Sequence, residues 1–191
     1  MAFDLGEHES DARLLARYAA GDQAAARALV ALHGPRVYAL ARRLLGDAAE
    51  AEDVAQEALL RLWRIAPDWR PGEARISTWL YRVATNLATD RLRRRRGVGL
   101  DAAPEPADEA PAVLDGLAAG ERVAAIRRAV ADLPERQRLA IELRHFEELG
   151  NPEIAEIMET SVEAVESLLA RGRRRLAAAL AGERAALGFD G

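Results

Sequence analysis

The 191-residue chain contains no cysteine, which excludes disulfide bonds, thiolate metal sites and a cysteine nucleophile. It contains no run of roughly 18 apolar residues, the length needed to span a bilayer. Its N-terminus, MAFDLGEHESDARLL, is acidic and lacks the basic start and apolar core of a signal peptide. These absences predict a cytoplasmic protein without membrane insertion.

Aromatic residues are also scarce, at 5% of the chain, and β-branched runs are absent, whereas alanine and leucine are abundant. This composition favours helices throughout, so we expect an all-α fold. The helical pattern covers residues 10–96 and resumes over residues 118–182. Between them, residues 97–117 carry three prolines, three glycines and five acids, a composition typical of a flexible linker. We therefore expect two small helical domains joined by a flexible acidic linker.

The net charge of −4 argues mildly against nucleic-acid binding, but the charges are unevenly distributed. All basic side chains are arginine, and residues 75–96 hold seven arginines and a single acid. Residues 97–118 hold five acids and no base. The first stretch is therefore a candidate surface for phosphate.

Short turn signals divide the first helical zone. Gly21–Asp22, His33–Pro35 and Gly46–Asp47 are predicted to separate helices. Asp47 is expected to cap a helix that runs to about Ile65. That helix buries a stripe formed by Ala51, Val54, Ala55, Ala58, Leu62 and Ile65.

The second helical zone carries the pattern of a helix-turn-helix. Asn151 is expected to cap a short helix with Pro152 in its first turn. Ser161 is expected to cap a final long helix that ends in arginines. Two helices joined by a short turn, the second basic at its end, are typical of a DNA-binding motif.

Three segments resemble a known family. AEDVAQEALLRLW (Ala51–Trp63) resembles the segment of sigma-factor region two that docks on RNA polymerase. STWLYRVATNLATDRLRRRR (Ser77–Arg96) resembles the adjoining segment that melts and reads the minus-ten promoter element. Residues 133–176 resemble region four, which reads the minus-thirty-five element. Their order, the short linker and the missing region three resemble the extracytoplasmic-function group of the sigma-70 family.

The resemblance implies a promoter-recognition subunit, not an enzyme, that requires no cofactor. Its implied partners are core RNA polymerase and promoter DNA in double- and single-stranded form. On the polymerase, the contacts would be the clamp of the largest subunit and the flap of the second-largest subunit. An anti-sigma factor is a further implied partner, because two domains on a tether expose surfaces that must be hidden when the factor is idle.

The candidate polymerase-binding residues share one side of their helix, opposite its buried stripe. They are Asp53, Gln56, Glu57 and Leu60. Spacing alone allows a simpler interpretation, a solvated acidic face with one stray leucine. With the resemblance, acids beside an exposed leucine suit a partner helix that offers arginine and an apolar pocket.

The candidate minus-ten residues combine aromatic rings with arginines, as single-stranded DNA binding requires. They are Trp69, Arg70, Arg75, Trp79, Tyr81, Arg82, Asn86, Arg93, Arg94, Arg95 and Arg96. Trp79 could instead be a core residue, and Asn86 could be merely solvated. Cations at a helix end complement the helix dipole, but the arginine run exceeds that need and favours duplex phosphate contact.

The candidate minus-thirty-five residues lie on the final helix. They are Glu163, Glu166, Ser167, Ala170, Arg171 and Arg174. Members of the group often carry glycine-threonine and then lysine where this chain has Glu163, Ala164 and Glu166. Carboxylates are unexpected near phosphates, so these glutamates either accept from a cytosine amino group or face away from DNA.

No catalytic or metal-binding constellation is apparent. His8, His33 and His145 are far apart in sequence, and no glycine-rich phosphate loop or serine elbow is present. The main alternative to a sigma factor is a regulator that binds DNA through its C-terminal helix-turn-helix and uses its first domain to sense or dimerise.

Overall fold

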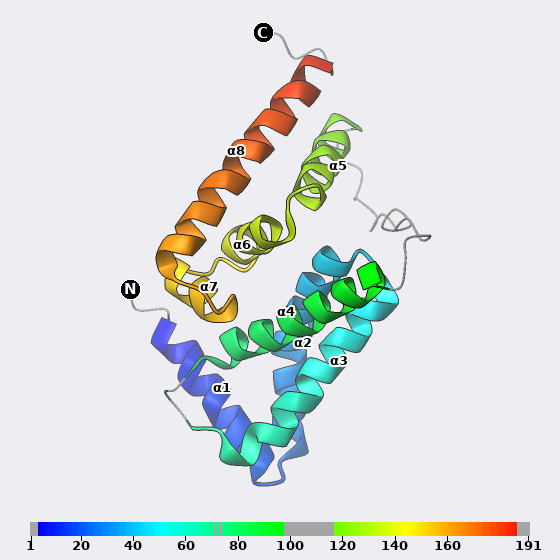
Figure 1. The fold of residues 1–191 in the computed structure, drawn as a ribbon. Helices are drawn as coiled ribbons and strands as arrows, with labels where there is room; N and C mark the ends of the chain where they lie inside the picture. The colour runs from blue at the N-terminus through cyan, green and yellow to red at the C-terminus, as the bar shows by residue number, and fades with distance from the viewer. Residues whose placement is uncertain (1–3, 71, 73, 98–116, 187–191) are drawn as a thin grey trace. The chain divides into compact units, whose positions relative to one another are not determined.

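A computed structural model describes residues 4–70, 72, 74–97 and 117–186 (Figure 1). The chain divides into two units, Met1–Pro106 and Ala107–Gly191. All regular structure in the described part is helical, so the predicted all-α class is confirmed. The predicted acidic linker lies, apart from its end residues, outside the described residues. None of the described helices is long and apolar enough to cross a membrane.

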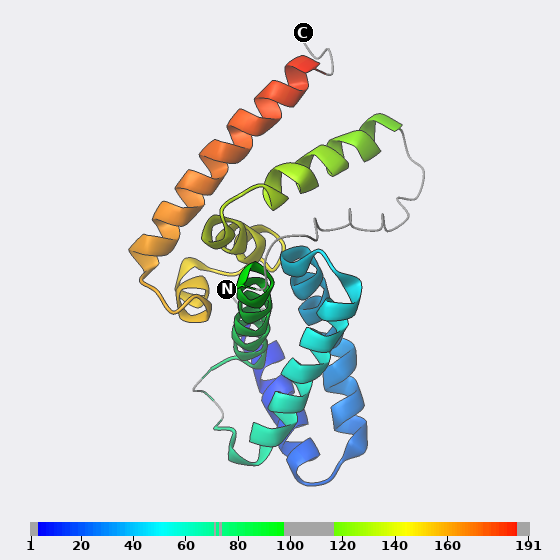
Figure 2. The same ribbon diagram turned by 45° about the vertical axis from the view of Figure 1, so that its right-hand side comes forward.

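The first unit is built around one long central helix. Its elements are α1 (Asp4–Ala19), α2 (Gln23–Leu45), α3 (Ala48–Ile65), the 3-10 helix η1 (Ala66–Asp68) and α4 (Ile76–Gly97). Helix α2 packs against α1, α3 and α4, and α3 also packs against α4 (Figures 1 and 2). The core is aliphatic, and its fully buried members include Leu15, Leu29, Leu40, Val54, Leu62 and Leu80.

Two of the three predicted helix boundaries in this unit are confirmed. Asp22 is the N-cap of α2, and its carboxylate accepts hydrogen bonds from the N–H groups of the next turn. Gly46 ends α2 with a φ of 72°, a left-handed conformation that favours glycine. Asp47 then caps α3 by accepting from the Glu50 N–H at 3.0 Å. A strong side-chain cap and a glycine are therefore enough to locate these helix ends.

The third boundary, at His33–Pro35, is wrong, because α2 continues through all three residues. A proline inside a helix lacks the N–H for one hydrogen bond and crowds the preceding turn, which costs about 3 kcal/mol. Gly34 has no Cβ to collide with the proline ring, so the usual restriction on the residue before proline is relaxed. His33 and Val37 are both buried, so packing on each side of Pro35 favours the continuous helix.

Two contacts attach α1 to the rest of the unit. His33 Nε2 lies 2.9 Å from an Asp11 carboxylate oxygen, and both side chains are buried. The rings of Tyr18 and Trp63 lie 4.6 Å apart between α1 and α3. A buried polar pair and an aromatic pair both require a defined geometry, so α1 is held in register as part of the first unit.

The second unit contains the expected helix-turn-helix. Its elements are α5 (Leu117–Ala131), α6 (Glu135–His145), α7 (Asn151–Ile157) and α8 (Val162–Ala186). Ile154, Val165 and Leu169 are buried where α7 and α8 pack together. A Cβ at Gly172 would lie 3.0 Å from Ile141 Cγ1, so glycine allows α8 to approach α6 closely.

One cap prediction in this unit is confirmed and the other is wrong. Ser161 Oγ accepts from the Ala164 N–H at 3.2 Å and so caps α8. Asn151 is not the cap of α7, because that helix already includes it and Gly150 is the N-cap. The Gly150 N–H donates to the Glu153 carboxylate at 2.9 Å. The glutamate of the first turn thus accepts from the N–H of the N-cap residue, whereas the expected asparagine cap would have accepted from an N–H group inside the first turn.

The buried and exposed leucines of α3 give a test of this core. Leu62 is fully buried, so Leu62→Ala should lower the free energy of unfolding by about 2–5 kcal/mol. Leu60 is 49% exposed, so Leu60→Ala should change it by less than about 0.5 kcal/mol. Urea unfolding followed by tryptophan fluorescence measures this, because all three tryptophans lie in the first unit. Equal losses from the two changes would contradict the placement of α3.

Candidate functional sites

The four predicted docking residues form one surface of α3. Asp53, Gln56 and Leu60 are exposed and Glu57 is partly exposed. The opposite side of the helix is buried through Ala51, Val54, Ala55, Ala58 and Leu62. The structure therefore brings the four together as a mixed surface, acidic and amide around one large exposed leucine. We call these four residues the α3 face.

The two acids of the α3 face differ in their surroundings. Glu57 accepts a hydrogen bond from Arg61 Nε at 2.8 Å, and Arg64 lies 3.8 Å away. The bond from Arg61 is the main cause that holds the pKa of the Glu57 carboxyl below its usual value. Asp53 is exposed and has no ion pair with any residue in the described part of the chain. An incoming cation would thus compete with Arg61 at Glu57 but not at Asp53.

A second apolar residue near this surface was missed at the sequence level. Val30 of α2 is 42% exposed. A Cβ built on Gly34 would lie 3.7 Å from Val30 Cγ1 and 4.0 Å from Leu59 Cδ1, so Val30 approaches α3. A helix that ended at His33–Pro35, as the turn signal predicts, would not place Val30 on the surface of a continuous helix. An uninterrupted 3.6-residue period would have been the signal.

A tryptophan pair lies at the loop between η1 and α4, with Trp69 at the start of the loop and Trp79 inside α4. The ring centroids of Trp69 and Trp79 lie 6.2 Å apart at 87°, an edge-to-face geometry. Both residues are partly exposed, so Trp79 is neither a fully buried core residue nor a free surface ring. Pro71 and Glu73 of this loop lie outside the described residues. The pair ties the start of the loop to the first turn of α4.

Most of the other minus-ten candidates lie at the surface, but one does not. Arg70 and Asn86 are exposed, and Arg75 and Arg82 are partly exposed. Tyr81 is only 2% exposed, so its ring offers no face to a base, and its expected stacking role is corrected here. The reason is periodicity, because Tyr81 lies two residues after Trp79 and therefore on another side of α4.

One side of α4 collects several of the remaining candidates. At about 100° per residue, Arg82, Asn86 and Arg93 lie within about 60° of Trp79 around the helix axis. Arg95 lies about 160° from Trp79 and so on the opposite side. We call Trp79, Arg82, Asn86 and Arg93 the α4 stripe.

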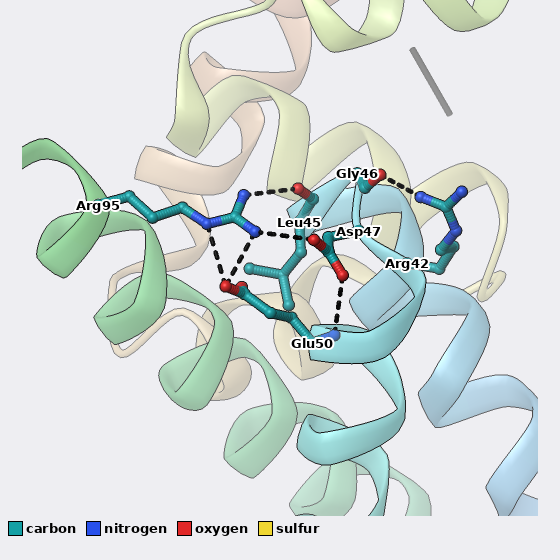
Figure 3. Close-up of polar contacts among 6 residues, drawn as sticks. All are labelled: Arg42, Leu45, Gly46, Asp47, Glu50 and Arg95. Carbon is teal, nitrogen blue, oxygen red and sulfur yellow. Dashed lines mark hydrogen bonds and ion pairs between the residues drawn. The ribbon is translucent and has the colours of Figure 1, made fainter. Parts of the chain in front are cut away.

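The arginine run that ends α4 is not uniform. Arg93 is largely exposed and lies 4.0 Å from Asp90, and Arg94 is exposed. The side chain of Arg96 lies outside the described residues. Arg95 instead reaches the turn between α2 and α3 (Figure 3). Its guanidinium contacts Glu50 at 2.9 Å, the Leu45 carbonyl oxygen at 3.2 Å and Asp47 at 3.5 Å.

The turn between α2 and α3 holds further polar contacts, made by Asp47 and Arg42. The Glu50 N–H is the main cause that lowers the pKa of the Asp47 carboxyl, and the charges of Arg95 and Arg42 lower it further. Arg42 donates to the Gly46 carbonyl oxygen (Figure 3). Asp47 is therefore an ionised carboxylate at neutral pH that caps α3 and also faces Arg95.

The six minus-thirty-five candidates all lie along α8. Glu163, Glu166, Ser167, Ala170, Arg171 and Arg174 are exposed. The main cause that lowers the pKa of the Glu163 carboxyl is its own backbone N–H, and Ser161 adds to it, so Glu163 interacts with the start of α8. Within the described helices, Glu166 forms no ion pair with Arg173 or Arg174. Arg171 Nε donates to the Ser167 carbonyl oxygen at 3.2 Å.

Comparison with known families covers both units. The family described as Sigma-70 region 2 matches residues 29–98, which include most of α2 and all of α3 and α4. The family described as Sigma-70, region 4 matches residues 124–176, which include the α7–α8 pair through most of its length. Each unit therefore matches one family region, in the order that the sequence resemblance indicated.

Individual relatives match over most of their length. The chain is 35% identical to the RNA polymerase sigma-H factor of Pseudomonas aeruginosa over 90% of this chain and 94% of the relative. It is 35% identical to the ECF RNA polymerase sigma factor SigW of Bacillus subtilis over 82% of this chain and 89% of the relative. A solved structure, CnrH in complex with the cytosolic domain of CnrY, matches with a TM-score of 0.68 and 28% identity, over 90% of this chain and 97% of CnrH.

Proposed function

Because this chain belongs to the extracytoplasmic-function group of the sigma-70 family, whose members direct RNA polymerase to promoters, we propose that the α3 face binds core RNA polymerase while α4 and α8 contact promoter DNA. Like other sigma factors, the chain is a non-catalytic protein that directs RNA polymerase to promoters. The observation that carries the proposal is the combination of an exposed acidic α3 face with basic α4 and α8 surfaces in one chain. A regulator with only a helix-turn-helix would leave the region 2 match unexplained. Because core RNA polymerase acts in the cytoplasm, we propose that this chain acts there too.

The α3 face suits the clamp of the largest polymerase subunit. Asp53 can accept from a partner arginine without first losing an intramolecular ion pair, and Leu60 offers an apolar side chain two turns further along the same side of α3. An apolar anchor flanked by charges is the usual composition of an energetically important interface centre. Val30 of α2 is a further exposed apolar side chain of the first unit.

The α4 stripe suits the minus-ten element. A partly exposed tryptophan followed by arginine and asparagine along one side of a helix provides a stacking surface, phosphate contacts and an amide that can read base edges. Trp69, Arg70 and Arg75 belong to the adjoining loop and are assigned to the unpaired strand. Arg93 and Arg94 are assigned to duplex phosphates, because both are exposed at the end of α4.

The second unit suits the minus-thirty-five element and the flap of the second-largest subunit. Helix α8 occupies the recognition position of the helix-turn-helix, and Arg171 and Arg174 are exposed along it. Three large apolar side chains, Val123, Ile126 and Phe146, are between 44% and 48% exposed. Apolar side chains at a protein surface are suited to a protein partner rather than to DNA.

The test of polymerase binding is a charge reversal on the α3 face. Asp53→Arg, alone or with Glu57→Arg, should weaken binding to core polymerase by about tenfold or more, because like charges would then meet across the interface. Glu52→Arg is the matched control, since Glu52 is exposed on the same helix but outside the face. Binding is measured by fluorescence titration at fixed ionic strength, with helicity followed by circular dichroism. Equal affinities for the Asp53 and Glu52 variants would contradict the proposed surface.

We also propose an inhibitory protein partner, an anti-sigma factor. The support is that the polymerase- and DNA-facing surfaces are exposed in the free chain, and that the related CnrH was solved in complex with a cytosolic domain of another protein. Affinity purification of the tagged protein from unstressed cells should recover a partner other than polymerase. That partner should lower transcription when added back to purified holoenzyme. Recovery of the factor alone, or with polymerase only, would count against the proposal.

Glu166 is proposed to read a base of the minus-thirty-five element. It is exposed early in α8, and the pairing with Arg173 or Arg174 that would have explained it otherwise is absent from the described helices. A glutamate that accepts from cytosine N4 gains roughly 1–3 kcal/mol of discrimination. Glu166→Lys should therefore change the selected base at one or two adjacent positions in a promoter-library selection. A rise in affinity with an unchanged base preference would show that Glu166 is not a reader.

A further inference from the structure

Arg95 differs from the other described members of the arginine run. Its side chain is 37% exposed, compared with 74% for Arg93. The guanidinium lies between two carboxylates and one carbonyl oxygen, all from the turn that joins α2 to α3 (Figure 3). These acceptors precede Arg95 by 45 to 50 residues in the sequence.

Each acceptor belongs to a helix end that needs a partner. The Leu45 carbonyl is in the last turn of α2, where carbonyl groups have no partner within the helix. Asp47 and Glu50 lie at the start of α3. Arginine presents five N–H donors in a rigid planar fork, so one side chain can contact all three acceptors. Arg95 therefore joins the end of α4 to the end of α2 and the start of α3.

These contacts compete with a phosphate. Arg95 would have to leave both carboxylates to bind DNA, and it lies on the side of α4 opposite the α4 stripe. Arg93 and Arg94 lie in the same last turns, and neither contacts the α2–α3 turn in the described part of the chain. The last turn of a helix frays unless it is held, and the contacts of Arg95 hold this one.

We propose that Arg95 is a positioning residue: it fixes the end of α4 on the α2–α3 turn so that Arg93 and Arg94 meet phosphate, and it does not bind phosphate itself. The inference rests on the proposed DNA-binding function of α4. It also links the two activities of the first unit, because the turn that Arg95 holds is the start of the helix that carries the α3 face.

Lysine substitutions separate positioning from phosphate binding. Lysine keeps the charge that a phosphate needs but cannot reproduce the arginine fork. Holoenzyme carrying Arg94→Lys should bind a promoter fragment about as well as the wild type. Arg95→Lys should weaken binding by at least about fivefold, the equivalent of roughly one lost contact. Rescue of Arg95→Ala by Arg95→Lys to wild-type affinity would overturn the inference.

Replacing Glu50 with glutamine should change promoter binding in opposite directions, depending on whether Arg95 positions α4 or binds phosphate. If Arg95 positions α4, Glu50→Gln should weaken promoter binding and add little to Arg95→Lys in the double variant. If the acids merely restrain a phosphate contact, Glu50→Gln should release Arg95 and strengthen binding. Glu52→Gln, an exposed change in the same turn of α3, is the matched control. Stronger binding by the Glu50 variant would overturn the inference.

The salt dependence distinguishes failure of this inference from failure of the proposed function. Arg94→Ala should flatten the log–log salt slope of promoter binding by about one unit. Arg95→Ala should lower the affinity but leave the slope unchanged, because Arg93 and Arg94 still reach phosphate in the complex and only the entropic cost of ordering the end of α4 is added. Unchanged slopes for Arg93→Ala and Arg94→Ala would refute the DNA role of α4. A one-unit loss of slope for Arg95→Ala beside the same loss for Arg94→Ala would refute only the positioning role.

Stability gives a separate test of the contact between Glu50 and Arg95. The changes in urea midpoint caused by the Glu50 and Arg95 substitutions should not add up in the double variant, and additive changes would also overturn the inference.

Discussion

The first unit depends on α2 remaining a single helix through Pro35. Helices α1, α3 and α4 all pack against α2, so a break at Pro35 would separate the surfaces on which they meet. The proline costs about 3 kcal/mol in a helix interior. Val37, Leu40, Ala41, Leu44 and Leu45 are buried after Pro35, and the burial of one large aliphatic side chain contributes about 1.5–3 kcal/mol. Packing beyond the proline therefore outweighs its local cost.

The surfaces of the other helices follow from this arrangement. Once α3 buries Val54, Ala58 and Leu62 against α2 and α4, its remaining side must face outward. The four residues of the α3 face are therefore exposed together because of how α3 packs, and no individual contact of their own is needed to orient them. The same holds for α4, where burial of Leu80 and Ala84 sends Trp79, Arg82 and Asn86 to another side of the helix. An amphipathic helix packed on a common support produces a defined docking surface at no further energetic cost.

Local sequence patterns therefore predict much of the fold and of the α3 face. They are wrong where contacts between residues far apart in the sequence determine the structure. Asp47 and Ser161 cap helices as expected, because a cap depends only on the next three residues. Pro35 is misjudged because the favourable packing comes from other helices. Arg95 cannot be told from Arg94 in the sequence, since both lie in one basic run and the acceptors of Arg95 are contributed by α2 and α3.

The arrangement of these arginines also explains how a chain with a net charge of −4 can have a DNA-binding surface. Net charge acts at long range and is screened within about 8–10 Å at physiological salt, whereas a phosphate contact depends on cations within a few ångströms. Acids at the α2–α3 turn neutralise Arg95, and Glu57 neutralises Arg61, both within the first unit. The arginines left exposed, such as Arg94, are then the ones with positive charge available at the surface. The strength of DNA binding should accordingly follow the number of such unpaired arginines on one side of α4, which is smaller than the number of arginines in the run.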